Sequence, residues 1–140
     1  MKKIHKRSVI LTLLAIALLF TMVLIAGKKS GITLDSEDKR REYIGSLGIT
    51  LTSEPPIVRN IVIPSEFSEV YSRYNELQKE SGFDLWSYRG EYAVQYSYTA
   101  TGYPDDTVKV NLILHKNILI GGDISSTRLD GFMTGLIPAQ

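Results

Sequence analysis

Cysteine is absent from this chain of 140 residues, and histidine occurs only twice, as His5 and His115. The first absence excludes disulfides, thiol nucleophiles and cysteine-based metal sites. The two histidines are far apart, and no segment has the residue spacing of a metal-ligand cluster. We therefore expect no metal and no other cofactor. Hydrophobic residues make up 44% of the chain, so packing can hold a small domain together without such crosslinks.

Acidic residues are missing from the first 29 positions, which carry six Lys and Arg residues. The remaining positions, 30–140, carry ten basic and all fifteen acidic residues, which leaves a net charge of about −5. Nucleic acids are bound by clustered basic surfaces. This charge distribution therefore excludes nucleic acid as an expected partner of the C-terminal part.

One long hydrophobic run, residues 9–26, contains no charge and only Thr12 and Thr21 as polar residues. As a helix, eighteen residues span roughly 27 Å, close to the ~30 Å of a bilayer's hydrocarbon core. We predict a single transmembrane helix at 9–27, preceded by a cytoplasmic basic head at 1–8 and followed by a tether at 28–34 and one domain at 35–140. Four basic residues before the run favour a cytoplasmic N-terminus, so the domain is expected outside the cell membrane.

A cleaved signal peptide is the main alternative for this segment. The run is longer than the 7–15 residues typical of a signal peptide, and no pair of small residues closes it. The stretch LIAG at 24–27 resembles the start of a lipoprotein box, but Lys28 stands where the lipid-bearing cysteine would be needed. These features favour an uncleaved signal anchor.

The external domain shows the patterns of both helices and strands. A first helix is predicted from an N-cap at Asp35 or Ser36 to the residues before Gly48, and a second from an N-cap at Ser65 to Glu80, with Gly82 closing it. The second carries hydrophobic residues at helical spacing, which form its core-facing side: Phe67, Val70, Tyr71, Tyr74 and Leu77. Strands are predicted at 49–51, 57–63, 92–99, 108–115 and 118–124, with a hairpin turn at 116–117 and a loop or short helix in 125–140. In 92–99 and 108–115 hydrophobic and polar residues alternate, which is typical of half-buried strands, with the odd-numbered side of 92–99 expected to face solvent. The fold class is therefore α+β: two helices and an antiparallel sheet that ends in a three-strand meander, with one helix packed on one face.

No complete catalytic motif is found. Ser36 and Lys39 match the Ser-x-x-Lys of penicillin-recognising enzymes, but the partner motifs are missing. Asp84, Asp123 and Asp130 are the carboxylates that a hydrolase would need, and turn chemistry explains the last two. Most of the eight tyrosines fall on hydrophobic faces, which favours core packing over an aromatic binding platform. We expect a protein that is not an enzyme.

The most plausible binding stretch lies near the C-terminus, where two adjacent glycines interrupt a strand. It combines exposed backbone, small polar groups and one cation: Gly121, Gly122, Asp123, Ser126, Arg128 and Asp130. A structural bulge, with its neighbours satisfying a turn, is the alternative interpretation.

Several short motifs occur in a characteristic order: IPSEF at 63–67, YNELQ at 74–78, GFDL at 82–85, IGGD at 120–123 and LDGFM at 129–133. In these the chain resembles an uncharacterised family, domain of unknown function 4830, found largely in low-GC Gram-positive bacteria behind a single N-terminal span. The resemblance covers about residues 42–136. It departs at Trp86, where the family carries a polar residue. It implies an anchored single domain and brings no reaction, cofactor or catalytic residue.

These observations lead to one functional hypothesis and two alternatives. The first is a membrane-anchored, extracytoplasmic binding or regulatory module of the bacterial cell envelope, with an envelope protein or a peptide or glycan ligand as partner. The second is a small envelope hydrolase that uses carboxylates near residues 121–132. The third is a structural spacer.

Overall fold

The computed structural model describes residues 31–103 and 107–137 of the chain. The chain divides into two units, Met1–Ser30 and Gly31–Gln140, and the predicted transmembrane helix at 9–27 lies outside the described residues. Within the described part, no helix has the length and hydrophobicity of a membrane span. The elements of that part are α2 (Glu37–Ser46), β1 (Ile57–Val62), α3 (Glu69–Glu80), the short 3-10 helix η1 (Leu85–Tyr88), β2 (Tyr92–Thr99), β3 (Val108–His115), β4 (Ile118–Ser126) and β5 (Met133–Gly135).

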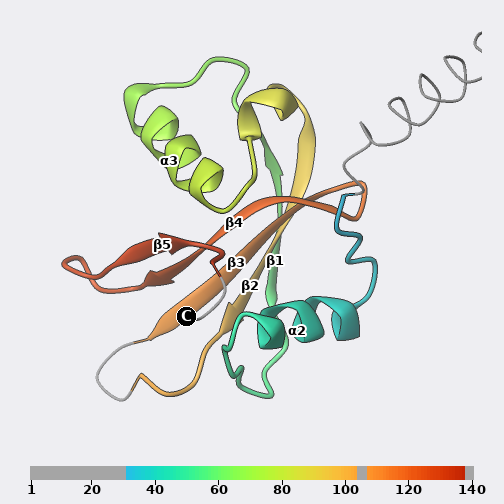
Figure 1. Cartoon of the computed structure of the whole chain (residues 1–140), viewed down its shortest axis with the longest axis vertical. Helices are drawn as coiled ribbons and strands as arrows, with labels where there is room; N and C mark the ends of the chain where they lie inside the picture. The colour runs from blue at the N-terminus through green and yellow to red at the C-terminus, as the bar shows by residue number, and fades with distance from the viewer. Residues whose placement is uncertain (1–30, 104–106, 138–140) are drawn as a thin grey trace, which may run out of the picture. The chain divides into compact units, whose positions relative to one another are not determined.

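The five strands form one antiparallel sheet in the order β1-β2-β3-β4-β5, so every strand pairs with its neighbour in sequence (Figure 1). The α+β class and the meander are confirmed, and the meander has five strands instead of three. Lys116 and Asn117 connect β3 to β4 with φ of 49° and 65°, as a two-residue hairpin of type I′ requires. The hairpin prediction is therefore confirmed.

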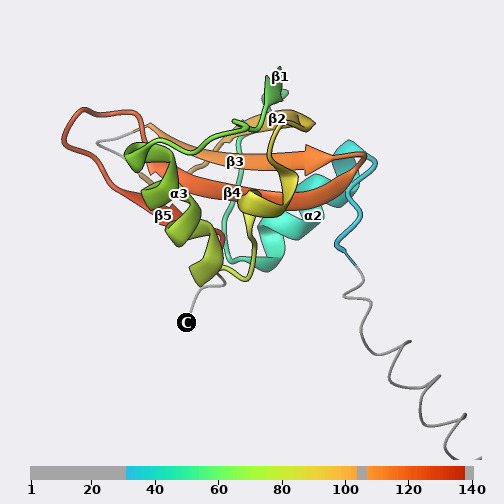
Figure 2. The same cartoon turned by 90° about the horizontal axis from the view of Figure 1, so that it is seen from above.

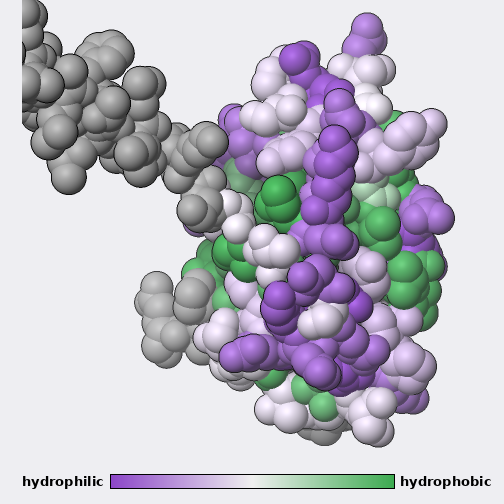
Figure 3. All heavy atoms as spheres, turned by 90° about the vertical axis from the view of Figure 1, so that its right-hand side faces the viewer, coloured by the Kyte–Doolittle hydropathy of each residue, from purple (hydrophilic) through white to green (hydrophobic). Residues whose placement is uncertain are grey.

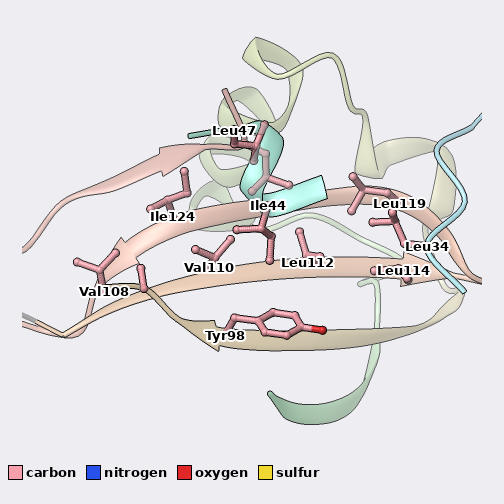
Figure 4. Packing of buried hydrophobic residues seen from close by; sticks show 12 residues of the cluster. Leu34, Ile44, Leu47, Tyr98, Val108, Val110, Leu112, Leu114, Leu119 and Ile124 are labelled. Atoms are coloured by element: carbon pink, nitrogen blue, oxygen red, sulfur yellow. The ribbon is translucent and has the colours of Figure 1, made fainter. Parts of the chain in front are cut away.

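One face of the sheet, which we call the α2 face, is covered by α2. Ile44 of that helix and Leu47, its C-cap, pack on strand residues that lie side by side across the sheet, Tyr98 opposite Val110 and Val110 opposite Ile124. Figure 4 shows these side chains gathered between α2 and the strands, all of them aliphatic except Tyr98. This cluster is the larger of the two cores. It contains the alternating hydrophobic residues predicted for β3, which are Val108, Val110, Leu112 and Leu114.

The opposite face, the α3 face, carries a second core. Ala93 and Ile113 point to this side because successive residues of a strand alternate between faces. Ile120 joins them from a β-bulge: Ile113 pairs with Gly121 and Leu114 with Leu119, which leaves Ile120 as the extra residue. Aromatic residues of α3 and its flanks, Phe67, Tyr71, Tyr74 and Tyr88, cover this cluster. The expectation of a helix on only one face is wrong.

The covering of both faces also corrects the prediction for β2, where one side was expected to face solvent. Ser97 and Ala93 on the expected solvent side are buried, whereas Tyr92 on the expected core side is 78% exposed. The expectation that most tyrosines pack in the core is confirmed, but Tyr88, expected in a turn, takes the place of Tyr92. The tyrosines in or against the two cores are Tyr43, Tyr71, Tyr74, Tyr88, Tyr96 and Tyr98.

The helix boundaries follow their caps. The Ser36 hydroxyl accepts a hydrogen bond from the amide of Lys39 at 3.3 Å, so α2 begins as predicted. The second helix begins later than predicted, because Ser68 rather than Ser65 accepts from the amide of Tyr71 at 3.2 Å. Its end at Glu80 is confirmed, with Gly82 in the left-handed region at φ 83°.

Two further predictions need correction. The strand expected at 49–51 is only a single bridge between Leu51 and Ala100, and Pro55 and Pro56 further along prevent its continuation as a strand. The segment expected to be a loop or a short helix contains strand β5, which pairs with β4 from Asp123 opposite Gly135 to Ser125 opposite Met133. The sheet therefore ends with a very short strand at one edge and with β1 at the other, as the view from above shows (Figure 2).

Candidate functional site

An open groove lies between α3 and β5 on the α3 face. It has a volume of about 530 Å³, within the ~300–1,000 Å³ usual for ligand pockets. We call it the α3–β5 groove, and its lining consists of Val70, Tyr71, Arg73, Tyr74, Leu77 and Met133. Val70 is 77% exposed and Met133 is 53% exposed, so two large hydrophobic side chains face solvent at its mouth.

The local sequence explains how the groove forms. Val70, Tyr74 and Leu77 are spaced four and three residues apart, so they lie on one face of α3. Met133 points to the same side of the sheet as Gly135, two residues further along β5. A Cβ at Gly135 would collide with the Ser81 hydroxyl and lie 3.0 Å from the carbonyl oxygen of Leu77. The glycine therefore lets the end of α3 lie directly on β5.

A polar network anchors the floor of the groove. Tyr74 donates its hydroxyl proton to Oδ2 of Asp123 at 2.8 Å. The other carboxylate oxygen, Oδ1, accepts from Nδ2 of Asn111 at 2.8 Å and from the Ser125 hydroxyl at 2.9 Å. Ser97 then donates to Oδ1 of Asn111 at 2.6 Å. The Asp123 side chain is thus satisfied by three neutral donors although the residue is only 4% exposed.

The electrostatics of this network fix the proton on the tyrosine. Burial raises the pKa of Tyr74 well above its ordinary value of 10.0, and the neighbouring charge of Asp123 raises it further. Tyr74 therefore remains a hydrogen-bond donor at any physiological pH. Its ring is held in place as a wall of the groove, and it cannot supply a phenolate nucleophile.

Gln78 supports the floor from a second side. Its Oε1 accepts from the amide of Gly122 at 2.7 Å, just beyond the last β4–β5 pair. A Cβ at Gly121 would lie 2.9 Å from that same oxygen, and one at Gly122 would collide with the carbonyl oxygen of Asn111. The two glycines are thus required by close approach of α3 on one face and of a strand backbone on the other.

The structure divides the predicted binding stretch in two. Gly121, Gly122 and Asp123 are buried in β4, and Asp123 lies in mid-strand rather than in the turn expected for it. Ser126, Arg128 and Asp130 lie at and beyond the end of β4 on the loop to β5. There, the Ser126 hydroxyl accepts from the Arg128 amide at 3.1 Å, and the Arg128 guanidinium lies 3.3 Å from Asp130. The two halves do not converge on one site.

The groove residues on α3 were not among the predicted site residues. Val70, Tyr74 and Leu77 were assigned to the core by their helical spacing, which is correct for Tyr74 but leaves Val70 at the surface. A signal for the network was present in the alternation of Ser97 on β2 and Asn111 on β3. Polar residues that face each other across two strands can bond to each other as well as to water.

A second hollow, of about 330 Å³, lies on the other side of α3 against η1. Its polar groups are already paired: Asn75 donates to Asp84 at 2.9 Å, and Lys79 lies 2.9 Å from Glu76. The hydrogen bond from Asn75 lowers the pKa of the Asp84 carboxyl. The first contact joins α3 to η1, and the second lies within α3. Together they leave the α3–β5 groove as the more open site.

Within residues 31–103 and 107–137, no three His, Asp or Glu side chains are placed to hold a metal ion together. The chain matches no protein-family model, no curated protein and no solved structure. The resemblance to domain of unknown function 4830 thus stays a prediction from the sequence motifs.

Proposed function

We propose that the chain is a membrane-anchored, extracytoplasmic binding module whose α3–β5 groove holds a hydrophobic segment of another protein of the cell envelope. The observation that carries this proposal is the exposure of Val70 and Met133 at the mouth of an open groove with a fixed floor. Exposed hydrophobic side chains around a hollow are typical of interaction sites. The anchor is the hydrophobic run at 9–26, and membership of domain of unknown function 4830 is part of the same proposal.

The chemistry of the groove favours a hydrophobic protein segment over a glycan. Val70, Leu77 and Met133 offer no hydrogen-bonding groups, and the Tyr74 hydroxyl is already engaged with Asp123. A sugar would lose its hydrogen bonds to water there without replacement. At the rim, Arg73 forms an ion pair with Glu69, and both side chains are largely exposed, so they can also bond to a peptide backbone.

The fixed floor would favour binding because little has to be ordered when a ligand enters. Tyr74 is held by Asp123, and Tyr71 packs on the ring of Phe67 at a centroid distance of 4.6 Å. A site that is ordered before binding avoids part of the entropy loss of association. The hydrolase alternative gains no comparable support, since Asp123 is enclosed by neutral donors.

A photocrosslinking amino acid at Val70, and separately at Met133, in the full-length chain tests the groove in living cells. We expect both positions to give the same adduct, joined to the same hydrophobic segment of one envelope protein. Val70→Glu should abolish the adduct formed from Met133, because it places a charge in the groove. The control is a crosslinker at Val58, which is 53% exposed on the far edge of the sheet and should not give this adduct. Adducts that are equal from all three positions, or none from the groove, would contradict the proposal.

The location of the module is tested separately. A C-terminal alkaline phosphatase fusion should be active, and a fluorescent protein that matures only in the cytoplasm should stay dark. Neutralising Lys2, Lys3, Lys6 and Arg7 together should give mixed orientation, because the remaining basic residues then lie on the other side of the span. The reverse pattern for the unmodified chain would overturn the proposed topology without bearing on the groove.

A further inference from the structure

Strand β1 presents an open backbone edge. It pairs with β2 on one side, where the Ile63 amide donates to Glu91 and the Ile63 carbonyl accepts from Gly90. Bonded positions of an antiparallel strand alternate, so the odd-numbered residues of β1 bond to β2 and the even-numbered ones turn their N–H and C=O outward. The outward groups belong to Val58, Asn60 and Val62. Among the described elements, none lies beyond this edge (Figure 2).

The side chains of this edge are exposed as well. Ile57 is 50% exposed, and Val58 and Val62 are each 53% exposed. Long hydrophobic edge strands are templates for pairing with another strand, and soluble proteins usually protect them with charges or bulges. Arg59 is the only charged residue of β1. The side of the molecule that carries the β3–β4 turn differs from the β1 edge. There, hydrophilic side chains form a broad band and hydrophobic side chains form only separate patches (Figure 3).

We propose that two copies of this chain join through β1 as an antiparallel pair, with the two-fold axis at Asn60. In that register the outward groups of Asn60 bond to their own counterparts in the second copy, and those of Val58 bond to Val62. The side chains that face each other are compatible in this register. The two Asn60 amides, which both donate and accept hydrogen bonds, are opposite each other, and on either side Val58 is opposite Val62.

The prolines that flank β1 are placed symmetrically about the same point. Pro56 and Pro64 are each four residues from Asn60, so they lie opposite each other in the proposed register. Both are even-numbered, and proline has no N–H to offer an added strand. The hydrogen-bond ladder would therefore begin and end at matched positions in the two copies. Pairing with an unrelated strand would not require the two prolines to be symmetric about Asn60.

Charge is also compatible with a second copy. Arg59 would lie opposite Ile61 of the other copy, so no two like charges face each other. The other sheet edge, β5, has three residues and lies against α3, so it cannot offer β1 a full-length partner. Pairing of β1 with itself closes the assembly at two copies, whereas pairing with β5 would continue without end.

A six-residue ladder is small compared with the ~1,200 Å² or more of a stable interface. The pair should therefore form where copies are concentrated, as in the membrane to which we propose the chain is anchored. The test accordingly uses full-length chain reconstituted in phosphatidylglycerol–phosphatidylethanolamine vesicles. Because the chain has no cysteine, a single introduced cysteine reports on one contact only.

Asn60→Cys should form a disulfide dimer under mild oxidation, since bonded antiparallel partners have Cα atoms about 5.5 Å apart, within the range that a disulfide spans. Arg59→Cys is the matched control: it neighbours Asn60, but its counterpart lies diagonally, at more than about 7 Å, and should crosslink poorly. Leu129→Cys, which is fully exposed on the loop from β4 to β5, measures random collision. Adding Val58→Lys and Val62→Lys to Asn60→Cys should lower the yield of dimer about tenfold, because lysines would then face each other twice.

Equal crosslinking at Asn60, Arg59 and Leu129, or a dimer that persists with both lysines, would overturn the proposal. So would a monomeric Asn60→Cys chain, or one crosslinked to a different protein when the same test is made in cell membranes. Circular dichroism of the lysine variant should match the unmodified chain, since both valines are more than half exposed. None of these variants touches the α3–β5 groove, so failure here and failure there are separate results.

Discussion

The two faces of the sheet use a tyrosine in opposite ways. On the α2 face, Tyr98 accepts a hydrogen bond from the Arg40 guanidinium at 3.0 Å, and this cation lies at the margin of an aliphatic core. On the α3 face, Tyr74 donates to the carboxylate of Asp123, which lies within the sheet among other polar side chains. The first arrangement seals a core against water. The second fixes the position of a ring that lines a groove.

This difference suggests a division of roles. The stability of the α2 face depends mainly on how side-chain volume fills the core. The stability of the α3 face depends mainly on hydrogen bonds and on close backbone approach. Substitutions that change volume should therefore act mainly on the first, and substitutions that change one polar atom mainly on the second. The free energy of unfolding tests that division; it is measured for the full-length chain by urea titration with the fluorescence of Trp86, the only tryptophan.

The largest effect is expected from Leu112→Ala on the α2 face. Leu112 is fully buried, and its removal should leave a cavity and lower the free energy of unfolding by about 4 kcal/mol. Leu112→Met, which nearly conserves volume, should cost less than about 1.5 kcal/mol. A similar loss for both variants would mean that the α2 face is also governed by something other than volume.

The next effect concerns the paired glycines, which point to different faces. Gly122→Ala should cost about 3 kcal/mol, because its Cβ would meet the backbone oxygen of Asn111, which cannot move without disturbing β3. Gly121→Ala should cost only about 1 kcal/mol, because its Cβ meets the ends of the Gln78 and Leu85 side chains. The comparison fails if the two variants unfold at the same urea concentration.

A smaller loss is expected when a single oxygen is removed from the α3 face. Tyr74→Phe leaves Oδ2 of Asp123 buried without its donor and should cost about 2 kcal/mol. Tyr71→Phe, in the same aromatic cluster but outside the Asp123 network, should cost about 0.5 kcal/mol or less. Should Tyr74→Phe prove as mild as Tyr71→Phe, the network would not be what holds the floor of the groove.

The dependence of stability on alkaline pH should report on Tyr74 as well. The pKa of Tyr74 is raised in the folded chain by burial and by Asp123, whereas in the unfolded chain it returns to about 10. Above pH 10 the unfolded state therefore releases a proton that the folded state retains, so stability falls as pH rises, by about 1.4 kcal/mol per pH unit for this group. Tyr74→Phe should reduce the slope of stability against pH between 10 and 11 by about that amount. An unchanged slope would show that Tyr74 does not carry this dependence.

The two faces also differed in how well the sequence predicted them. Val108, Val110 and Leu112 alternate as hydrophobic residues should, and the α2 face follows from them directly. Ser97 and Asn111 alternate on the other side and resemble solvent-facing residues, so the burial of that face could not be inferred from hydrophobicity. Their polar groups are instead satisfied by hydrogen bonds to one another and to Asp123, which depend on strand register.

Short elements were missed by the sequence-based prediction for a related reason. Strand β5 is only Met-Thr-Gly, and its pairing with β4 rather than any preference of its own makes it a strand. The groove depends on β5, because Met133 forms one of its walls. The predicted site therefore included residues of β4 but none of α3 or β5, whose side chains line the groove. Ser65 and Ser68 were both acceptable caps by residue type, and the structure uses the second.

The smallest expected effect compares the helices that cover the two faces. Gly45 lies within α2 and Gly82 follows the end of α3, and neither would bring a Cβ within 4 Å of another part of the protein. They differ in backbone: Gly82 has φ of 83°, where a side chain is strained, whereas Gly45 lies in a regular helix. Gly45→Ala should therefore raise the free energy of unfolding by about 0.7 kcal/mol, because alanine favours the helix, while Gly82→Ala should lower it by about 1 kcal/mol. Opposite signs would show that α2 is limited by its intrinsic helix propensity and α3 by the geometry of its end. If both variants were destabilised, Gly45 would have to be held in place by a contact on the α2 face rather than tolerated there.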